Sequence, residues 1–213
     1  MAFAGWPPSA SDFYAGLLAD NSKAYWQANR TVYDEHIRGP MEELLDELEP
    51  EFGPWKIFRP YRDVRFSRDK SPYKTHIGAT IGHGYVQLDA HRLAVGAGMW
   101  EMAADQLERY RRSVDDARTG AALEALVASA RGEGLTVMGH DELKTAPRGF
   151  PKDHPRIELL RYKGLVAWGE WPAGPWLGSA AAKDRIVEFF RTCRPLVGWL
   201  GTNVGATTQP PRG

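Results

Sequence analysis

The sequence predicts an α+β fold in which N-terminal helices precede an antiparallel sheet that is covered by helices. Three observations lead to this prediction: helical spacing of apolar residues over the first fifty positions, strand-like alternation from about 55 to 95, and a return to helical spacing after 100. Of the 213 residues, 43% are hydrophobic and 25% are charged, which is the composition of a globular protein. We expect a single domain over residues 1–206 and a flexible polar tail over residues 207–213.

Three helices are predicted in the first fifty residues. Apolar side chains recur every three or four positions over residues 9–20 and again over residues 21–38. We expect the second helix to stop near Gly39-Pro40 and a third to run from there until Pro50 and Gly53 break it. The candidate N-caps are Ser9, Ser11, Asn21 and Ser22.

A meander of strands is predicted next, because apolar residues alternate with polar ones from Trp55 onward. Gly82-His83-Gly84 and Asp89-Ala90-His91 have the composition of the turns between these strands. The predicted strands cover residues 55–58 and 75–81 and two further segments within 85–95.

Helical spacing returns after Gly96-Ala97-Gly98, which we interpret as a turn. The helices predicted here cover residues 101–117, 119–131 and 180–193, with a helical turn or two over 157–162. Short strands are predicted over residues 135–137, 143–145 and 164–168.

The charges of the chain are balanced overall but concentrated in one segment. Lys plus Arg and Asp plus Glu both number 27, so no overall field attracts nucleic acid or an anionic membrane. Between Lys56 and Lys74, however, seven Lys or Arg stand against two Asp. Guanidinium groups prefer planar acceptors such as carboxylate or phosphate, so this segment predicts a local site for an anion.

The predicted ligand is a small anionic molecule that carries a phosphate or a carboxylate. Turn chemistry at Asp69-Lys70-Ser71-Pro72 would bring the end of the segment back alongside its arginines. The residues expected to hold the anion are Arg59, Arg62, Arg65, Lys70 and Lys74, with Asp63 and Asp69 orienting the arginines and Tyr73 and His76 as candidate catalytic proton donors. In the alternative interpretation the two aspartates pair with the arginines in a network that only stabilises the fold.

The segment from Arg59 to Ile77, R-P-Y-R-D-V-R-F-S-R-D-K-S-P-Y-K-T-H-I, resembles the hallmark of DUF2461, a microbial family described as a domain of unknown function. The resemblance extends over residues 13–204. Further similar segments are Asp20–Trp26, with its aromatic pair reversed, Gly96–Trp100, Lys144–Phe150 and His154-Pro155. It implies kinship, but no activity, cofactor or catalytic set.

A second group of cations lies on either side of a loop that contains proline and glycine. Lys144, Arg148 and Lys163 belong to this group. We expect the loop to close over the first basic segment, so that these three residues join the ligand site.

Two other classes of function stay open. A nucleic-acid-binding module would use the same basic segment, with bases stacked on a tryptophan loop formed by Trp168, Trp171 and Trp176. Core anchoring is the simpler interpretation of those tryptophans. A non-catalytic interaction protein would have its basic residues fully paired.

Several other features favour plain structural roles. Six histidines without paired spacing predict no metal site, and the Gly-x-Gly pairs lack the pattern of a dinucleotide loop. The single cysteine, Cys193, is expected to be a buried apolar residue and leaves no intrachain disulfide. The first residues show no basic stretch followed by an apolar one, and no apolar run is long enough to span a membrane. We therefore expect a cytoplasmic protein without a membrane partner.

Overall fold

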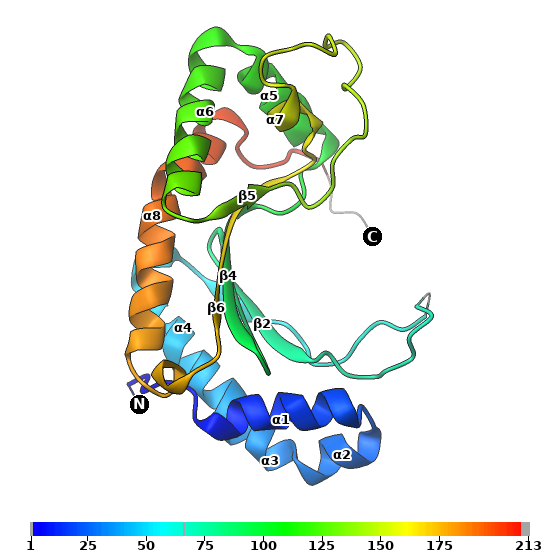
Figure 1. The fold of residues 1–213 in the computed structure, drawn as a ribbon, viewed down its shortest axis with the longest axis vertical. Coiled ribbons are helices and arrows are strands. Elements are labelled where there is room, and N and C mark those ends of the chain that lie inside the picture. The colour runs from blue at the N-terminus through cyan, green and yellow to red at the C-terminus, as the bar shows by residue number, and fades with distance from the viewer. Residues whose placement is uncertain (1, 66, 210–213) are drawn as a thin grey trace. The chain divides into compact units, whose positions relative to one another are not determined.

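A computed structural model describes residues 2–65 and 67–209, and part of the predicted tail, residues 210–213, lies outside them. The α+β prediction is confirmed (Figure 1). The helices are α1 (Pro8–Ala19), α2 (Lys23–Ala28), α3 (Arg30–Val32), the π-helical η1 (Tyr33–Arg38), α4 (Gly39–Phe52), α5 (Ala104–Asp115), α6 (Ala117–Gly132), α7 (Ile157–Arg161), the 3₁₀ turn η2 (Pro175–Gly178) and α8 (Ala181–Asn203). The strands are β1 (Trp55–Ile57), β2 (His76–Ile81), β3 (Gly84–Asp89), β4 (Arg92–Met99), β5 (Thr136–Met138) and β6 (Leu165–Pro172), in the sheet order β1-β2-β3-β4-β6-β5.

The described chain divides into two compact units. The first combines Met1–Val95 with Glu170–Phe189, and the second combines Gly96–Gly169 with Phe190–Gly213. That the two together form a single domain stays a prediction.

The helical part of the first unit is organised around aromatic side chains. Ser22 is the N-cap of α2, as predicted, and its Oγ accepts a hydrogen bond from the Tyr25 N–H at 3.1 Å. The buried Phe13 ring lies 5.7 Å from Trp26 and 5.8 Å from Tyr33, which joins α1, α2 and η1. α4 contacts β1 and β2 and so covers this part of the sheet.

The predicted helix break at Gly39-Pro40 is wrong. The chain remains helical from Arg30 to Phe52 because η1 widens the turn: the Gly39 N–H donates to the carbonyl of Asp34, five residues back. A wide π turn accommodates the missing N–H and the bulky ring of Pro40 without ending the helix. Pro50 lies inside α4 and does not break it, whereas Gly53, with φ 99°, is the C-cap that ends the helix, as predicted.

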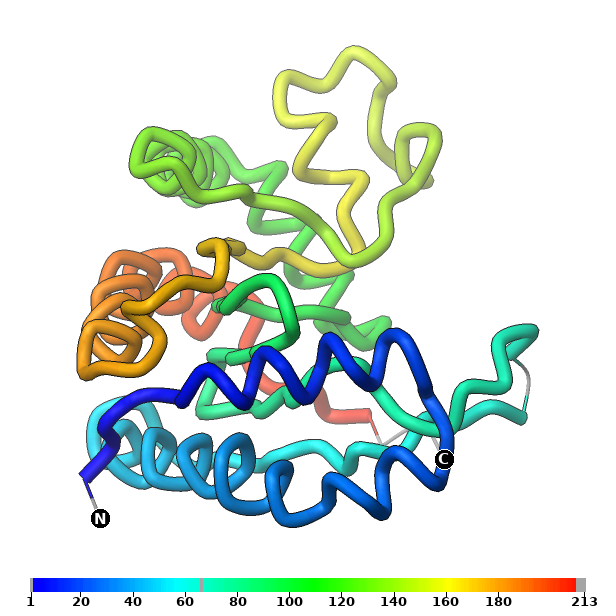
Figure 2. The backbone as a smooth tube through the Cα atoms, turned by 60° about the horizontal axis from the view of Figure 1, so that its bottom comes forward, coloured from blue at the N-terminus to red at the C-terminus, as the bar shows by residue number. Residues whose placement is uncertain are grey.

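The predicted meander of β1, β2 and β3 is confirmed. Trp55 pairs with Ile81 across the β1–β2 ladder, and His76 pairs with Asp89 across β2–β3, both antiparallel. The residues between β1 and β2, 58–65 and 67–75, do not follow the sheet and project from it as an arm (Figures 1 and 2). This arm contains most of the basic segment.

The second unit contains the packed helices α5 and α6 and the paired part of strands β5 and β6. α5 packs on α6, whose N-cap Asp116 accepts hydrogen bonds from the backbone of Arg118 and Thr119. β5 pairs antiparallel with β6, with Thr136 opposite Trp168. From the C-terminal part of α8, the Trp199 indole N–H donates to the Thr119 carbonyl at 3.0 Å.

Several local predictions for this region are wrong. Gly96-Ala97-Gly98 continues β4 instead of forming a turn, and residues 143–145 form no strand, because only an isolated bridge joins Glu142 to Tyr162. α8 continues through Pro195 to Asn203. Trp168 and Trp171 lie on β6 and not in a loop.

Two of the remaining expectations concern Cys193 and the membrane. Cys193 is buried and free, as predicted, and burial raises the pKa of its thiol to about 12. Among the described residues, no helix is both long and apolar enough to cross a bilayer.

Candidate functional site

Main-chain hydrogen bonds close the base of the arm. The Arg62 N–H donates to the Pro72 carbonyl at 2.9 Å, and the Lys74 N–H donates to the Pro60 carbonyl at 2.7 Å. An antiparallel bridge joins Tyr61 to Tyr73 between them. The end of the basic segment therefore returns alongside its start, as predicted, but residues 69–72 form no turn; a main-chain hydrogen bond from the Ser67 N–H to the Val64 carbonyl lies in the arm instead.

The arm is fixed to the helices through Tyr73. The side-chain amide of Asn21, which follows α1, donates to the Tyr73 carbonyl at 3.0 Å and accepts from the Tyr73 N–H at 3.1 Å. The Tyr73 ring stacks on Trp26 with a centroid distance of 4.3 Å and an interplanar angle of 6°. This packing buries Tyr73, so its ring joins the arm to the helices.

Three of the predicted anion ligands already have partners within the arm. Arg62 forms an ion pair with Asp69, Arg65 pairs with Asp63 at 2.7 Å, and the Lys70 ammonium donates to a main-chain carbonyl at 2.9 Å. This arrangement realises part of the stabilising network that was the alternative interpretation. Arg65, Asp63, Asp69 and Lys70 are all exposed, so each such pair contributes little stability.

The two aspartates respond to these contacts. Hydrogen bonds from the side chain and main chain of Arg65 lower the pKa of Asp63 to about 2. Hydrogen bonds from Ser71 and then from Arg62 hold the pKa of Asp69 well below its usual range. Both carboxylates are therefore charged at neutral pH and can hold their arginines in place.

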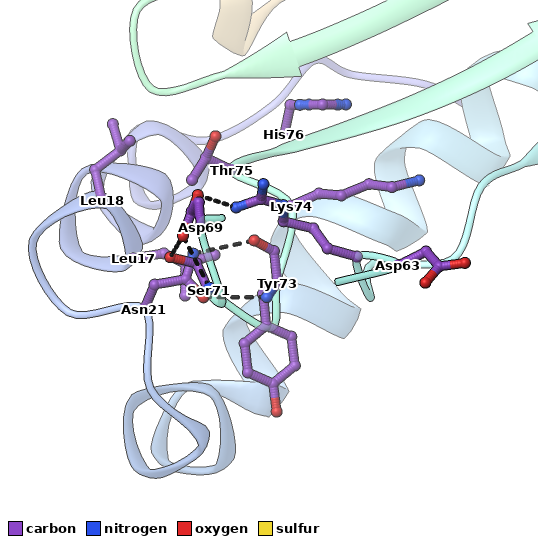
Figure 3. Close-up of a pocket in the computed structure, with 11 residues that line it drawn as sticks. Leu17, Leu18, Asn21, Asp63, Asp69, Ser71, Tyr73, Lys74, Thr75 and His76 are labelled. Atoms are coloured by element: carbon purple, nitrogen blue, oxygen red, sulfur yellow. Dashed lines mark hydrogen bonds and ion pairs between the residues drawn. The ribbon is translucent and has the colours of Figure 1, made fainter. Parts of the chain in front are cut away.

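A pocket of about 510 Å³ lies beside the base of the arm. Leu17, Leu18 and Asn21 line it from α1 and the following turn, and residues from both sides of the arm complete it (Figure 3). Of the seven cations in the basic segment, Arg62 and Lys74 are the two that are not fully exposed, and both line this pocket. The two least exposed cations of the basic segment are therefore also cations that line the pocket.

Lys74 lies in an unusual environment for an ammonium group. Its Nζ lies 5.4 Å from the centre of the Phe58 ring, and burial followed by the charge of Arg59 lowers the Lys74 pKa. In the described part of the chain, no carboxylate pairs with Lys74. A partly desolvated cation beside a second cation is costly unless an anion joins it, and such groups gather at functional sites.

His76, two positions after Lys74 in sequence, also lines the pocket (Figure 3). Burial, and then the charge of Lys74, lower the pKa of the half-buried imidazole below 6.5. The ring is therefore neutral at pH 7 and offers one donor and one acceptor. No described residue forms a hydrogen bond with it.

The remaining predicted ligands lie elsewhere. Arg59 is exposed on the arm. Lys144, Arg148 and Lys163 belong to the second unit, where Lys163 forms an ion pair with Asp141 and Lys144 is exposed. That they join the first basic segment around a ligand stays a prediction.

Sequence reasoning missed the contributions of Asn21, Ser71 and Thr75 to the site. The sequence indicates Asn21 only as a helix cap, although it lies in one of the segments that carry the family resemblance. Its partner Tyr73 is far away in sequence, and no local pattern reports such a contact. Ser71 supports Asp69 through a hydrogen bond of 2.6 Å from its hydroxyl.

The fold and site define an α+β protein with a basic arm and a pocket at the base of that arm. The chain belongs to the family described as "Conserved hypothetical protein (DUF2461)", whose model matches residues 9–199. No curated protein and no solved structure matches the chain. Within the described residues, no group of three or more His, Cys, Asp or Glu is arranged to hold a metal ion.

Proposed function

We propose that the pocket at the base of the arm binds a small anionic molecule through a phosphate or carboxylate group. The observation that carries this proposal is the half-buried Lys74 ammonium, which has a second cation nearby and no carboxylate partner among the described residues. A bound oxyanion would offset the cost of its burial.

Arg62 is the second ligand in this proposal. Its Nη1 is engaged by Asp69, while its Nε and Nη2 form no hydrogen bond with any described residue. A guanidinium fixed through one nitrogen retains donors for an anion and loses little side-chain entropy on binding. Asp69 thus orients Arg62, and Ser71 in turn holds Asp69.

His76 and Arg59 complete the proposed site. The neutral imidazole of His76 can donate a hydrogen bond to the bound anion or accept a proton from it. His76 is therefore the residue of this site that could support proton transfer. Arg59 adds positive potential from outside the pocket, since its charge already acts on Lys74. The proposed role is binding, and a reaction would require His76.

Thermal unfolding of the purified protein tests the proposal. Melting curves are recorded with inorganic phosphate, small carboxylates and phosphorylated metabolites, for the wild type, Lys74→Met and the matched control Lys56→Met, which removes an exposed lysine from β1. A ligand at 100 times its Kd stabilises the native state by about 2.7 kcal/mol. We expect an anion to raise the Tm of the wild type and of Lys56→Met but not of Lys74→Met.

Without ligand, Lys74→Met should melt at the wild-type temperature or above it, because methionine removes the buried charge at nearly constant shape. An anion-induced shift that persists in Lys74→Met would overturn the proposal. No shift with any anion, combined with strong destabilisation of the double variant Arg62→Ala, Arg65→Ala, would favour the non-catalytic, structural interpretation of the network.

A second candidate function is binding of single-stranded nucleic acid. The arm exposes two aromatic rings, Phe58 at 38% and Tyr61 at 47%, beside the exposed Arg59, and bases stack on such rings. The test is the anisotropy of a labelled oligonucleotide at about 50 and 200 mM salt, since phosphate contacts make affinity fall steeply with salt. Binding that is lost in Phe58→Ala, Tyr61→Ala would support this function. No binding at about 50 mM salt would exclude it, and equal binding in the variant would exclude stacking on these two rings.

A further inference from the structure

A second cavity, of about 460 Å³, lies within the second unit between α5 and the loop that precedes α7. Its volume falls in the range of small-molecule sites. Leu107 and Phe150 supply apolar surface, and Arg111 and Arg148 supply guanidinium groups. It shares no residue with the pocket at the base of the arm.

Arg111 projects from the same face of α5 as Leu107, because residues four apart lie above one another on a helix. It is half-buried, and this burial lowers its pKa. Its Nε donates to the Leu160 carbonyl at 3.2 Å, which fixes the guanidinium and leaves both terminal nitrogens available. No described carboxylate pairs with it.

The acidic residues that line this cavity have partners of their own. Glu108 pairs with Arg112 at 2.7 Å. Asp115 lies 3.1 Å from His154 Nε2, and His154 Nδ1 accepts a hydrogen bond from a main-chain N–H, so Nε2 carries the proton that is donated to Asp115. Neither acid neutralises Arg111.

A tight turn positions Arg148 and Phe150. The Phe150 N–H donates to the carbonyl of the buried Pro147 at 3.2 Å, and Gly149 has φ 92°, as the third residue of a type II turn requires. Arg148 occupies the second position of this turn and forms no ion pair with a described residue. The segment Lys144–Phe150 thus has a structural explanation: its proline and glycine place the exposed Arg148 and the half-buried Phe150 in the lining of the cavity.

We infer that this cavity binds a small organic oxyanion with an apolar body, its carboxylate or phosphate held between Arg111 and Arg148 and its apolar part against Leu107 and Phe150. Two guanidinium groups suit the planar oxygens of a carboxylate or the oxygens of a phosphate monoester. Inorganic phosphate would lack the apolar contact, and an uncharged amide would lack the ionic one. The inference is independent of the pocket that contains Lys74.

Calorimetric titration with 3-phenylpropionate and with phenyl phosphate tests the inference, with 3-phenylpropionamide and inorganic phosphate as the ligands that lack one feature. The protein carries Lys74→Met throughout, so that the pocket at the base of the arm does not contribute. The variants are Arg148→Ala, which keeps Pro147 and Gly149, and the matched control Arg118→Ala, which removes an exposed arginine that does not line the cavity.

We expect at least one of the two organic anions to bind. The anion that binds more tightly shows whether the cavity prefers a carboxylate or a phosphate. Arg148→Ala should weaken its binding about tenfold or more, as for the loss of one charge-assisted hydrogen bond, and Arg118→Ala should leave it unchanged. Nuclear magnetic resonance should show shifts of the Gly149 and Phe150 amides on binding. No binding of either anion, equal binding of the uncharged amide, or equal losses in the two variants would each overturn the inference.

Discussion

The side-chain amide of Asn21 forms two hydrogen bonds with the main chain of Tyr73, across 52 positions of the sequence. One amide therefore satisfies both polar groups of a buried residue in the returning side of the arm. The two segments that meet here, Asp20–Trp26 and Arg59–Ile77, are two of the segments that resemble the same family in sequence. Their contact explains why both are needed for one local structure.

Asn21→Ala should loosen the arm. It leaves the N–H and carbonyl of Tyr73 without their partner, and an unsatisfied buried polar group costs about 1–3 kcal/mol. We expect a lower free energy of unfolding in denaturant titrations and faster hydrogen exchange of the Tyr73 amide. Asn29→Ala is the control, because its side-chain amide donates to the Tyr25 carbonyl, four residues back, and forms no hydrogen bond with the arm among the described residues. Unchanged hydrogen exchange of the Tyr73 amide in Asn21→Ala would show that the two hydrogen bonds from Asn21 do not hold the arm in place.

The elements that were predicted correctly depend on neighbours in sequence. The cap at Ser22 and the meander from Trp55 both follow from residues within a few positions of one another. For the site, the sequence predicts the concentration of cations and the return of the arm. It does not predict which cations are half-buried, because that depends on how the arm lies against α1.

The wrong predictions share a physical cause: long-range contacts override local preference. Gly96-Ala97-Gly98 has turn composition but extends β4, because Gly98 lets the chain approach the main chain of Leu165 closely. At Gly39-Pro40 the break was avoided by a π-helical turn, which the sequence pattern does not signal.

Two buried tyrosines should respond in opposite ways to removal of the hydroxyl group. The Tyr14 hydroxyl is buried and has no hydrogen-bond partner in the described chain, whereas the Tyr110 hydroxyl donates to the Leu159 carbonyl at 3.0 Å. Tyr14→Phe should therefore raise the free energy of unfolding by about 1 kcal/mol, and Tyr110→Phe should lower it by about 1 kcal/mol. Chemical denaturation of both variants measures the difference, and a loss in Tyr14→Phe as large as in Tyr110→Phe would mean that its hydroxyl is satisfied in solution.

Two glycines of the second unit form a similar pair. A Cβ at Gly98 would lie 2.2 Å from the Leu165 carbonyl oxygen, at φ 139°, whereas a Cβ at Gly198, inside α8, meets no atom within 4 Å. Gly98→Ala should cost about 3 kcal/mol or more, and Gly198→Ala should stabilise by about 1 kcal/mol through helix propensity. Thermal melts of the two variants test this, and a Gly98→Ala protein as stable as the wild type would show that β4 and β6 can separate at this point.

The titration of His76 connects stability with the proposed ligand. Because burial and Lys74 lower the imidazole pKa below 6.5, the unfolded chain binds more protons than the folded one as the pH falls through 6.5. The free energy of unfolding should therefore decrease over that range, and it should decrease less in His76→Gln.

Nuclear magnetic resonance of the His76 ring, assigned by comparison with His76→Gln, should give a titration midpoint below 6.5 without ligand. An anion bound beside Lys74 would favour the imidazolium, so the midpoint should rise when the pocket is filled and should not rise in Lys74→Met. A ligand-free midpoint at or above 6.5 would contradict both the buried environment of His76 and its neutral state at pH 7.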